Sequence, residues 1–330
     1  MTQIDIYGLG AALLDTEVEV SDGDLSALSV EKGVMTLVDE PRQHELMASL
    51  KGHLVASKRA SGGSAANSII AASYFGSHTF YSCRVANDEN GEFYLADLAS
   101  AGVQYHSSNG SNDGITGKCL VMITPDAERT MNTFLGISEQ LCFDDVDESA
   151  LKQSKYVYIE GYQVTSESGR PTAIKLRQQA EALGVKTALT LSDPAIVKFF
   201  HDGMREMVGD GVDILFCNEQ EAQSFTQCDD LDSAFEALKT YAKTFAITRG
   251  SEGALIFDGE ERIAVSAPEV KAIDTNGAGD MFAGAFLHAL SQGKNYRTAG
   301  EFGCKAAAQI VTQFGPRLQP EQYKALVASL

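Results

Sequence analysis

The segment DTNGAGD, residues 274–280, joins three small residues to a carboxylate at the start of a predicted helix. Gly277, Ala278 and Gly279 have no bulky side chain, so their backbone N–H groups can converge on one anion. The N-terminus of a helix adds partial positive charge at the same place. The carboxylate of Asp280 can take a proton from a hydroxyl group. The heptapeptide therefore indicates transfer of an anionic group to a hydroxyl; the alternative is a capped core helix with a tight entry turn.

Two N-terminal segments carry groups that suit a polyhydroxyl ligand. Gly62 and Gly63 precede a predicted helix that carries Asn67 in its first turns. Paired glycines let a ligand approach the backbone, and a carboxamide both donates to and accepts from hydroxyls. Asp15 is predicted to end the first strand, where open parallel sheets place ligand-binding groups. A plain turn is the alternative interpretation of each segment.

Two later segments suit a nucleotide. Asn218 and Glu221, in NEQE, follow the apolar run VDILFC and could arrange Mg²⁺ and its waters around phosphates. The alternative is a helix cap followed by an acid in the first turn. The segment TRGSEGA, residues 248–254, offers a glycine turn after a strand, with the cationic Arg249 beside it.

Other catalytic motifs are incomplete. The GLG turn at residues 8–10 follows a strand, as a dinucleotide-binding turn does, but Leu13 stands where the third glycine belongs. The segment around Gly117 and Lys118 lacks both the first glycine and the Ser or Thr of a phosphate-binding loop. The six histidines show no metal-ligand spacing.

Composition excludes several classes of function. Lys and Arg number 26 against 45 Asp and Glu, a net charge of −19, which argues against a nucleic-acid surface. Six cysteines without a C-x-x-C pair indicate reduced thiols rather than disulfides or a zinc site. No apolar stretch reaches the ~20 residues that cross a bilayer, and no signal peptide is recognisable. We expect a cytoplasmic protein with neither a membrane nor a nucleic-acid partner.

The order of predicted elements indicates an α/β fold. In the C-terminal half, continuous apolar strands alternate with amphipathic helices, which is typical of a parallel sheet covered on both faces. The segments near 16–25 and 105–136 do not fit this alternation, and residues 114–135 are predicted to form a hairpin. We therefore expect one doubly wound domain over residues 1–330, with a small β-sheet lid built from those two segments.

Several motifs together resemble one family. DTNGAGDMFAGAFL resembles the C-terminal signature of the PfkB, or ribokinase-like, carbohydrate kinases, and SGGSAANS with CRVANDENG is similar to the N-terminal one. NEQE matches the N-x-x-E motif of that family, and LTLSDP and VDILFCNEQEA are most similar to its adenosine-kinase branch. The resemblance implies a ribokinase-like fold and transfer of the ATP γ-phosphoryl group to a primary hydroxyl of a sugar or nucleoside. It also implies ATP, Mg²⁺ and, as in some relatives, K⁺.

The resemblance further implies a role for each motif residue. Asp280 would be the catalytic base, and the amides of Gly277, Ala278 and Gly279 would form the anion hole. The acceptor would contact four residues: Asp15, Gly62, Gly63 and Asn67. The ATP site would comprise Asn218, Glu221, Thr248, Arg249, Gly250 and Gly253. Among these, Glu221 would hold Mg²⁺ through water, and Asp274 and Asn276 would contact the monovalent cation.

Three departures from the family pattern leave the acceptor open. Ala11 replaces an Asn of the adenosine-kinase branch, Ala66 replaces a Gln, and Ala86 replaces the glycine of a G-x-D motif. The first two changes lie near the expected acceptor pocket, so a sugar is an alternative to a nucleoside. Two other functions are alternatives to kinase activity: a non-catalytic sensor of the same fold, and an oxidoreductase that uses residues 8–10. A monomer and a homodimer are both compatible with the sequence.

Overall fold

The computed structural model describes residues 3–53, 59–110, 112–126 and 128–330. Within these residues a sheet of nine strands has the order β14-β13-β12-β11-β10-β9-β1-β5-β6. The strands from β12 to β6 are parallel, and β13 and β14 continue the sheet as an antiparallel edge. The bounds are β1 (Ile4–Leu9), β5 (Thr79–Ser82), β6 (Gln104–Tyr105), β9 (Ser154–Ile159), β10 (Lys186–Thr190), β11 (Val212–Asn218), β12 (Ala242–Thr248), β13 (Ala254–Phe257) and β14 (Arg262–Val265).

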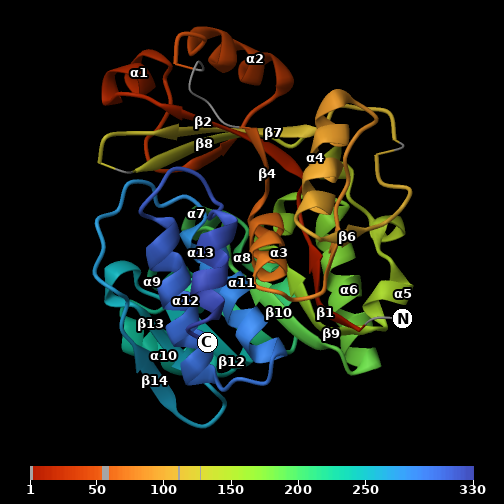
Figure 1. The fold of residues 1–330 in the computed structure, drawn as a ribbon, viewed down its shortest axis with the longest axis vertical. Coiled ribbons are helices and arrows are strands. Elements are labelled where there is room, and N and C mark those ends of the chain that lie inside the picture. The colour runs from red at the N-terminus through yellow and green to blue at the C-terminus, as the bar shows by residue number, and fades with distance from the viewer. Residues whose placement is uncertain (1–2, 54–58, 111, 127) are drawn as a thin grey trace.

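Helices cover both faces of this sheet, as predicted (Figure 1). The strand β11 shows why, because Phe216 packs into one hydrophobic cluster and Leu215 into the other. One face carries α3 (Ser64–Tyr74), α4 (Glu89–Ser100), α11 (Ala278–Ser291), α12 (Tyr296–Ile310) and α13 (Pro320–Val327). The other carries α5 (Glu148–Leu151), α6 (Gly169–Leu183), α7 (Pro194–Phe199), α8 (His201–Val208), α9 (Glu219–Thr226) and α10 (Leu231–Leu238).

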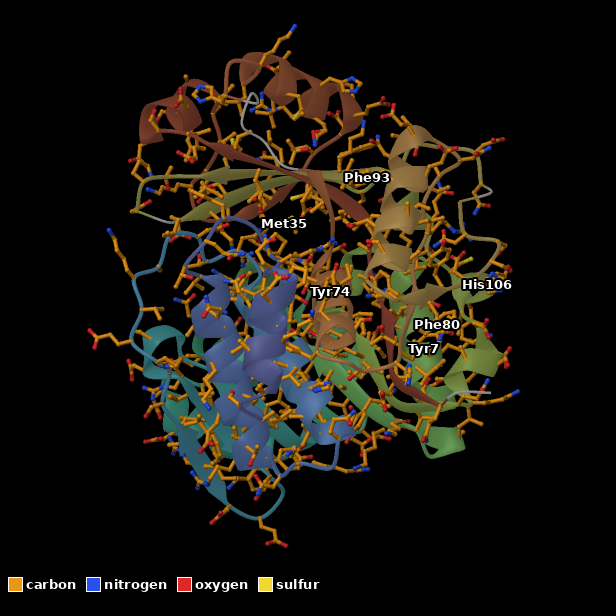
Figure 2. The ribbon with its side chains drawn as sticks, viewed as in Figure 1. Tyr7, Met35, Tyr74, Phe80, Phe93 and His106 are labelled. Carbon is orange, nitrogen blue, oxygen red and sulfur yellow. The ribbon has the colours of Figure 1, made fainter. Side chains whose placement is uncertain are left out.

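A second sheet of five strands, within the described residues, lies across one end of the first (Figure 1). Its order is β3-β8-β7-β2-β4, with β2 (Leu13–Glu19), β3 (Met35–Leu37), β4 (Arg59–Gly62), β7 (Gly117–Ile123) and β8 (Arg129–Phe134). The helices α1 (Asp22–Ala27) and α2 (Glu40–Ser49) cover its outer face through a small apolar cluster. Its inner face looks toward the large sheet, and Met35 lies in the space between them (Figure 2).

The two sheets are joined through β1. This strand is anchored in the large sheet: the rings of Tyr7 in β1 and Phe80 in β5 are stacked, with their centroids 5.0 Å apart (Figure 2). After β1 ends at Leu9, the chain turns directly into β2 of the small sheet. The small sheet therefore begins where the parallel strands end at their carboxyl termini, which is where α/β folds bind ligands.

The lid differs from the expected segments 16–25 and 105–136. Its first part runs from β2 to β4 and includes β3, whereas residues 104–105 form β6 in the large sheet. Residues 22–27 are helical because Ser21 and Asp24 form a reciprocal capping box that ends the extended segment. The expectation that Asp15 ends the first strand is wrong, since Asp15 lies inside β2.

All six cysteines are free: Cys83, Cys119, Cys217 and Cys304 are buried, and Cys142 and Cys228 are partly exposed. Among the described residues, no helix combines the length and apolar character needed to cross a membrane.

Candidate active site

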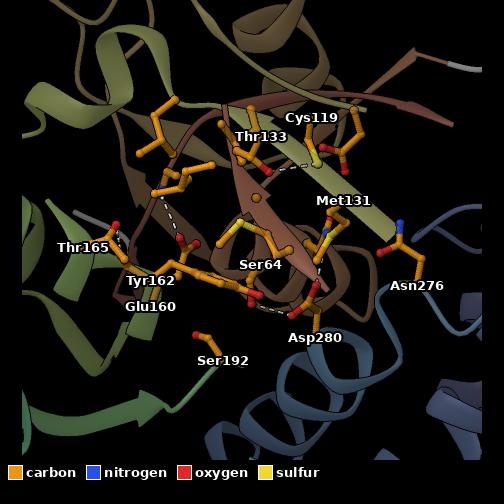
Figure 3. A pocket seen from close by; sticks show the side chains of 18 of the residues that line it. Ser64, Cys119, Met131, Thr133, Glu160, Tyr162, Thr165, Ser192, Asn276 and Asp280 are labelled. Atoms are coloured by element: carbon orange, nitrogen blue, oxygen red, sulfur yellow. Dashed lines mark hydrogen bonds between the residues drawn. The ribbon is translucent and has the colours of Figure 1, made fainter. Parts of the chain in front are cut away.

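Asp280 lies in the first turn of α11 and is held by two side chains of α3 (Figure 3). The hydroxyl of Ser64 donates to Oδ1 at 2.6 Å, and Nδ2 of Asn67 donates to Oδ2 at 3.1 Å. Burial raises the pKa of Asp280, while these two hydrogen bonds and the charge of Arg129 oppose the rise. The carboxylate is thus fixed in orientation and is a stronger base than an exposed aspartate.

The turn before Asp280 depends on glycine. Gly277 is the N-cap of α11 with φ +73°, a left-handed conformation that favours glycine. A Cβ at this position would also lie 2.8 Å from the ring of Pro316. The amide of Ala278 donates to the carbonyl of Thr275 at 3.3 Å and so closes the turn. Gly279 is exposed beside Asp280, and a Cβ added there would meet nothing within 4 Å.

Among the cavities formed by the described residues, three adjoin this turn. The lid cavity lies between the inner face of the small sheet and α3 (Figure 3), the turn cavity lies over residues 277–279, and the edge cavity continues from the turn toward α12. Four residues line both the lid cavity and the turn cavity: Ser64, Arg129, Ser192 and Asp280. Asp280 therefore stands where two ligands, one in each cavity, would meet.

The lid cavity has a polar end and an apolar wall. Asp15 is 6% exposed, and burial together with the nearby charge of Glu17 raises its pKa. The side-chain nitrogen of Asn67 donates a hydrogen bond to Asp280. The buried Oδ1 of Asn67 has no hydrogen-bond partner among the described residues. Gly62 faces Asp15 across the small sheet, where a Cβ would lie 2.1 Å from the carboxyl group. The wall includes Leu13, Met35, Leu37, Met131, Leu135 and Tyr162.

Asn218 and Glu221 form a capping box at the start of α9 and also line the turn cavity. Nδ2 of Asn218 donates to Oε1 of Glu221 at 2.7 Å, and the Asn218 amide donates to Oε2 at 2.9 Å. Burial raises the pKa of Glu221 to about 7. The two interpretations of NEQE are therefore compatible, because the cap presents its polar groups to a cavity.

The glycine turn after β12 forms part of the lining of the edge cavity. Thr248, Gly250 and Gly253 line it, opposite an apolar wall that includes Val270 and Val311. Such a wall suits a flat heterocycle.

Arg249 differs from its neighbours in this turn. It does not line the edge cavity, and its guanidinium group binds Glu219 and Glu252 instead. Its expected place in an ATP site stays a prediction.

Asp274 and Asn276 close the start of the turn. Asp274 is buried, and its carboxylate accepts from the amides of Asn276 and Gly315 at 2.8 and 2.9 Å. The side chain of Asn276 contacts the small sheet: it accepts from Arg129 at 3.2 Å and donates to Glu17 at 3.3 Å. A role of this pair in binding a monovalent cation stays a prediction. Among the described residues, no cluster of three or more His, Cys, Asp or Glu suits a metal ion.

Sequence reasoning missed several residues of the site. Arg129 is in β8, Glu160 follows β9, and Ser192 follows β10. The ends of β9 and β10 were a usable signal, because carboxyl ends of parallel strands meet at one edge of the sheet. Arg129 offered no such signal, since it reaches the site only through the placement of the small sheet.

Comparison with known proteins assigns the chain to a family. The family model described as pfkB family carbohydrate kinase matches residues 34–322. The chain belongs to this family. Among solved structures, an adenosine kinase from Sinorhizobium meliloti is 31% identical with a TM-score of 0.93, covering 100% of both chains. A probable sugar kinase from Rhizobium etli has the same identity and TM-score, over 100% of this chain and 99% of the other. The adenosine kinase of Saccharomyces cerevisiae is 29% identical over 95% of this chain and 96% of its own.

Membership confirms the predicted family resemblance, the ribokinase-like α/β fold with its lid, and kinase activity toward an alcohol group. The oxidoreductase alternative is wrong, and the GLG turn has a packing explanation. A Cβ at Gly8 would lie 2.5 Å from the side chain of Ile69, and one at Gly10 would lie 2.5 Å from Oε2 of Glu160. These glycines let α3 and Glu160 approach the end of β1.

Proposed function

We propose that this pfkB kinase transfers the γ-phosphoryl group of ATP to the primary hydroxyl of a nucleoside, with Asp280 as the base. The observation that carries the proposal is the position of Asp280, oriented by Ser64 and Asn67 where the lid cavity meets the turn cavity. An acceptor hydroxyl in the lid cavity and a terminal phosphate in the turn cavity would both lie beside this carboxylate.

The proposed reaction asks little covalent chemistry of the protein. Asp280 accepts the proton of the acceptor hydroxyl as its oxygen bonds to the γ-phosphorus, and the bond to the β-phosphate oxygen breaks to release ADP. Negative charge on the transferring group faces the N-terminus of α11 at Gly279. Arg129, which lines both cavities, adds a full positive charge. The small sheet lines the lid cavity, where it would exclude water that otherwise competes as the acceptor.

ATP and Mg²⁺ fit the remaining residues. The apolar wall of the edge cavity suits adenine, and the polar turn cavity connects it to Asp280. Mg²⁺ bound with ATP neutralises phosphate charge. Asn218 and Glu221 would hold it through water, since Mg²⁺ usually keeps several waters and binds few protein carboxylates.

The lid cavity favours a nucleoside over a free sugar. Asp15 and the free Oδ1 of Asn67 suit ribose hydroxyls, whereas the aliphatic and sulfur-containing wall suits a base rather than more hydroxyls. The relatives named adenosine kinase support adenosine as the first candidate.

An acceptor panel tests this function. ADP release is measured with adenosine, ribose, fructose and ketodeoxygluconate at equal concentrations, and we expect adenosine to give the highest kcat/KM. A higher kcat/KM for a sugar would overturn the nucleoside acceptor but keep the kinase chemistry. Binding of ATP and an acceptor without turnover of any compound would favour the sensor alternative.

Gly62→Ala tests the acceptor subsite. A Cβ there would lie 2.1 Å from the carboxyl group of Asp15, so that carboxyl must move out of its binding position. We expect the KM for the acceptor to rise at least about tenfold, the effect of losing about 1.4 kcal/mol of binding, with the KM for ATP unchanged. Gly23→Ala in α1 is the matched control, because its nearest contact would be an ordinary 3.5 Å. An unchanged acceptor KM in Gly62→Ala would remove Asp15 from the subsite.

A further inference from the structure

A buried carboxylate that the proposed reaction does not use lines the lid cavity. Glu160 follows β9 and is 1% exposed. Its charge is stabilised by neutral groups: Oε2 accepts from the amide of Ala65 at 2.9 Å, Oε1 accepts from the amide of Ala11 at 3.4 Å, and the side chain of Gln163 adds a hydrogen bond. Burying a charge on neutral partners is costly, and such groups are frequently functional.

The helix that Glu160 contacts has no cap of its own. The N-cap of α3 is Gly63, which provides no side-chain hydrogen bond to the first turn. Another residue would be strained there, because φ is +100° and a Cβ would lie 2.3 Å from the carbonyl oxygen of Ala11. Local sequence therefore cannot supply the acceptor that a first-turn amide needs. Glu160 supplies it from a different element of the fold.

The capped turn is the one that orients the proposed base. Ser64 and Asn67, on either side of Ala65 in α3, hold the two oxygens of Asp280. Glu160 also binds the amide of Ala11, in the segment that leads into β2 and Asp15. One carboxylate thus connects both segments that carry the acceptor-binding groups.

We propose that Glu160 is a positioning residue: it caps α3 from outside the helix and sets the alignment of Ser64 and Asn67 with the acceptor. The identity of the acceptor rests on the proposed function, but the capping role does not. A negative charge at a helix N-terminus is stabilising, and the ionised carboxylate accepts from both amides more strongly than the protonated one.

The capping strength should vary near neutral pH. Burial raises the pKa of Glu160 to about 7, and the charge of Asp280 in α11 contributes to the rise. Four other titratable groups, for which an interaction with Glu160 is found among the described residues, have raised pKa values and stay neutral at this pH: Tyr81, Cys83, Tyr94 and Tyr158. Glu160 ionises as the pH rises through about 7, so its cap is complete above that pH and weakens below it.

Glu160→Gln tests the proposal, with Asp147→Asn as the matched control. Asp147 caps α5 by accepting from the amides of Ser149 and Ala150, and it lines none of the three cavities. Steady-state kinetics at pH 8 should show an acceptor KM raised about 3- to 30-fold in Glu160→Gln, the range that follows from loss of a cap. The KM for ATP should change less than twofold. In the wild type the acceptor KM should be higher at pH 6 than at pH 8, and in Glu160→Gln this difference should disappear.

Several outcomes distinguish a positioning role of Glu160 in acceptor binding from a role in the stability of the fold alone. A lower Tm in both variants with an unchanged acceptor KM in Glu160→Gln would overturn the proposal. If Glu160→Gln does not fold, Glu160→Asp takes its place: a raised acceptor KM supports the role and a wild-type value overturns it. If the wild type phosphorylates no acceptor, the proposed function fails separately. Hydrogen exchange of residues 61–67 then decides the cap, since faster exchange in the variant supports it and equal exchange overturns it.

Discussion

Asp280→Asn is expected to lower kcat by about 10²–10⁴-fold, the contribution of a positioned general base. The asparagine keeps the shape of the side chain but cannot take the proton of the acceptor hydroxyl. Binding of ATP should persist, because Asp280 does not line the edge cavity proposed for adenine, and the change to asparagine removes a negative charge beside the proposed site of the terminal phosphate. Single-turnover kinetics and calorimetric ATP titration measure the two effects separately.

The pH dependence gives the same experiment a second readout. Burial raises the pKa of Asp280, so the wild type should lose activity, as the pH falls, at a higher pH than an ordinary aspartate would give. This acid limb should be absent from the residual activity of Asp280→Asn.

The thermal stability of Asp280→Asn should stay the same or rise, although its kcat falls. A carboxyl group whose pKa is raised by folding contributes stability that is present below its unfolded pKa and is lost as the pH rises through its folded pKa, so at pH 8 the ionised Asp280 destabilises the folded state. Asp280→Asn should therefore melt at the same Tm as the wild type or a higher one at pH 8. Asp258→Asn, in the exposed turn after β13, is the control for the chemical change. Near-normal kcat in Asp280→Asn would remove this residue from the mechanism.

Local signals in the sequence were sufficient for the large sheet and for the turn at Asp280. The apolar strands of the C-terminal half are buried on both faces, and this appears directly as continuous hydrophobic runs. Gly277 adopts a positive φ that few other residues tolerate, so the turn is encoded in the residues that form it. The capping box at Ser21 is equally local, because Ser21 and Asp24 lie three residues apart, and it marks where the extended part of the lid segment ends and α1 begins.

Contacts between distant segments could not be predicted in the same way. Glu160 reaches the amide of Ala65 across 95 residues, and Arg129 reaches Asn276 across 147. A single sequence does not say which of many charged residues a second sheet will carry to the active site. The position of Asp15 shows the same limit, because its strand belongs to the small sheet and yet its carboxyl group lines the expected cavity.

Arg129→Gln is expected to have the second large effect, a loss of about 10²–10³-fold in kcat. Mutations that remove a preorganised donor aimed at developing charge typically cost this much, and an arginine on a transferring phosphoryl group can be worth more. Nη1 of Arg129 lies 3.2 Å from Oδ1 of Asn276, at the start of the turn, and its side chain lines both cavities. The kcat of Arg129→Lys should lie between the values of the wild type and Arg129→Gln, because lysine keeps the positive charge but lacks the planar guanidinium group.

The matched control is Arg42→Gln, which removes another arginine of the lid. Arg42 lies in α2 on the outer face, where it contacts Glu45 and the carbonyl of Leu28. Its loss should leave kcat within about twofold, because exposed ion pairs contribute little. A kcat for Arg129→Gln as close to the wild type as that of Arg42→Gln would contradict a role in phosphoryl transfer.

The two catalytic predictions are coupled through charge. The positive charge of Arg129 lowers the pKa of Asp280 against the effect of burial, so Arg129→Gln should move the acid limb of the pH profile to higher pH. No shift would mean that the arginine is too far from the base during catalysis, and a shift to lower pH would contradict the effect of its charge on the pKa of Asp280. Because Arg129 belongs to the small sheet and Asp280 to the large domain, the direction of this shift also reports whether the lid lies over the base during turnover.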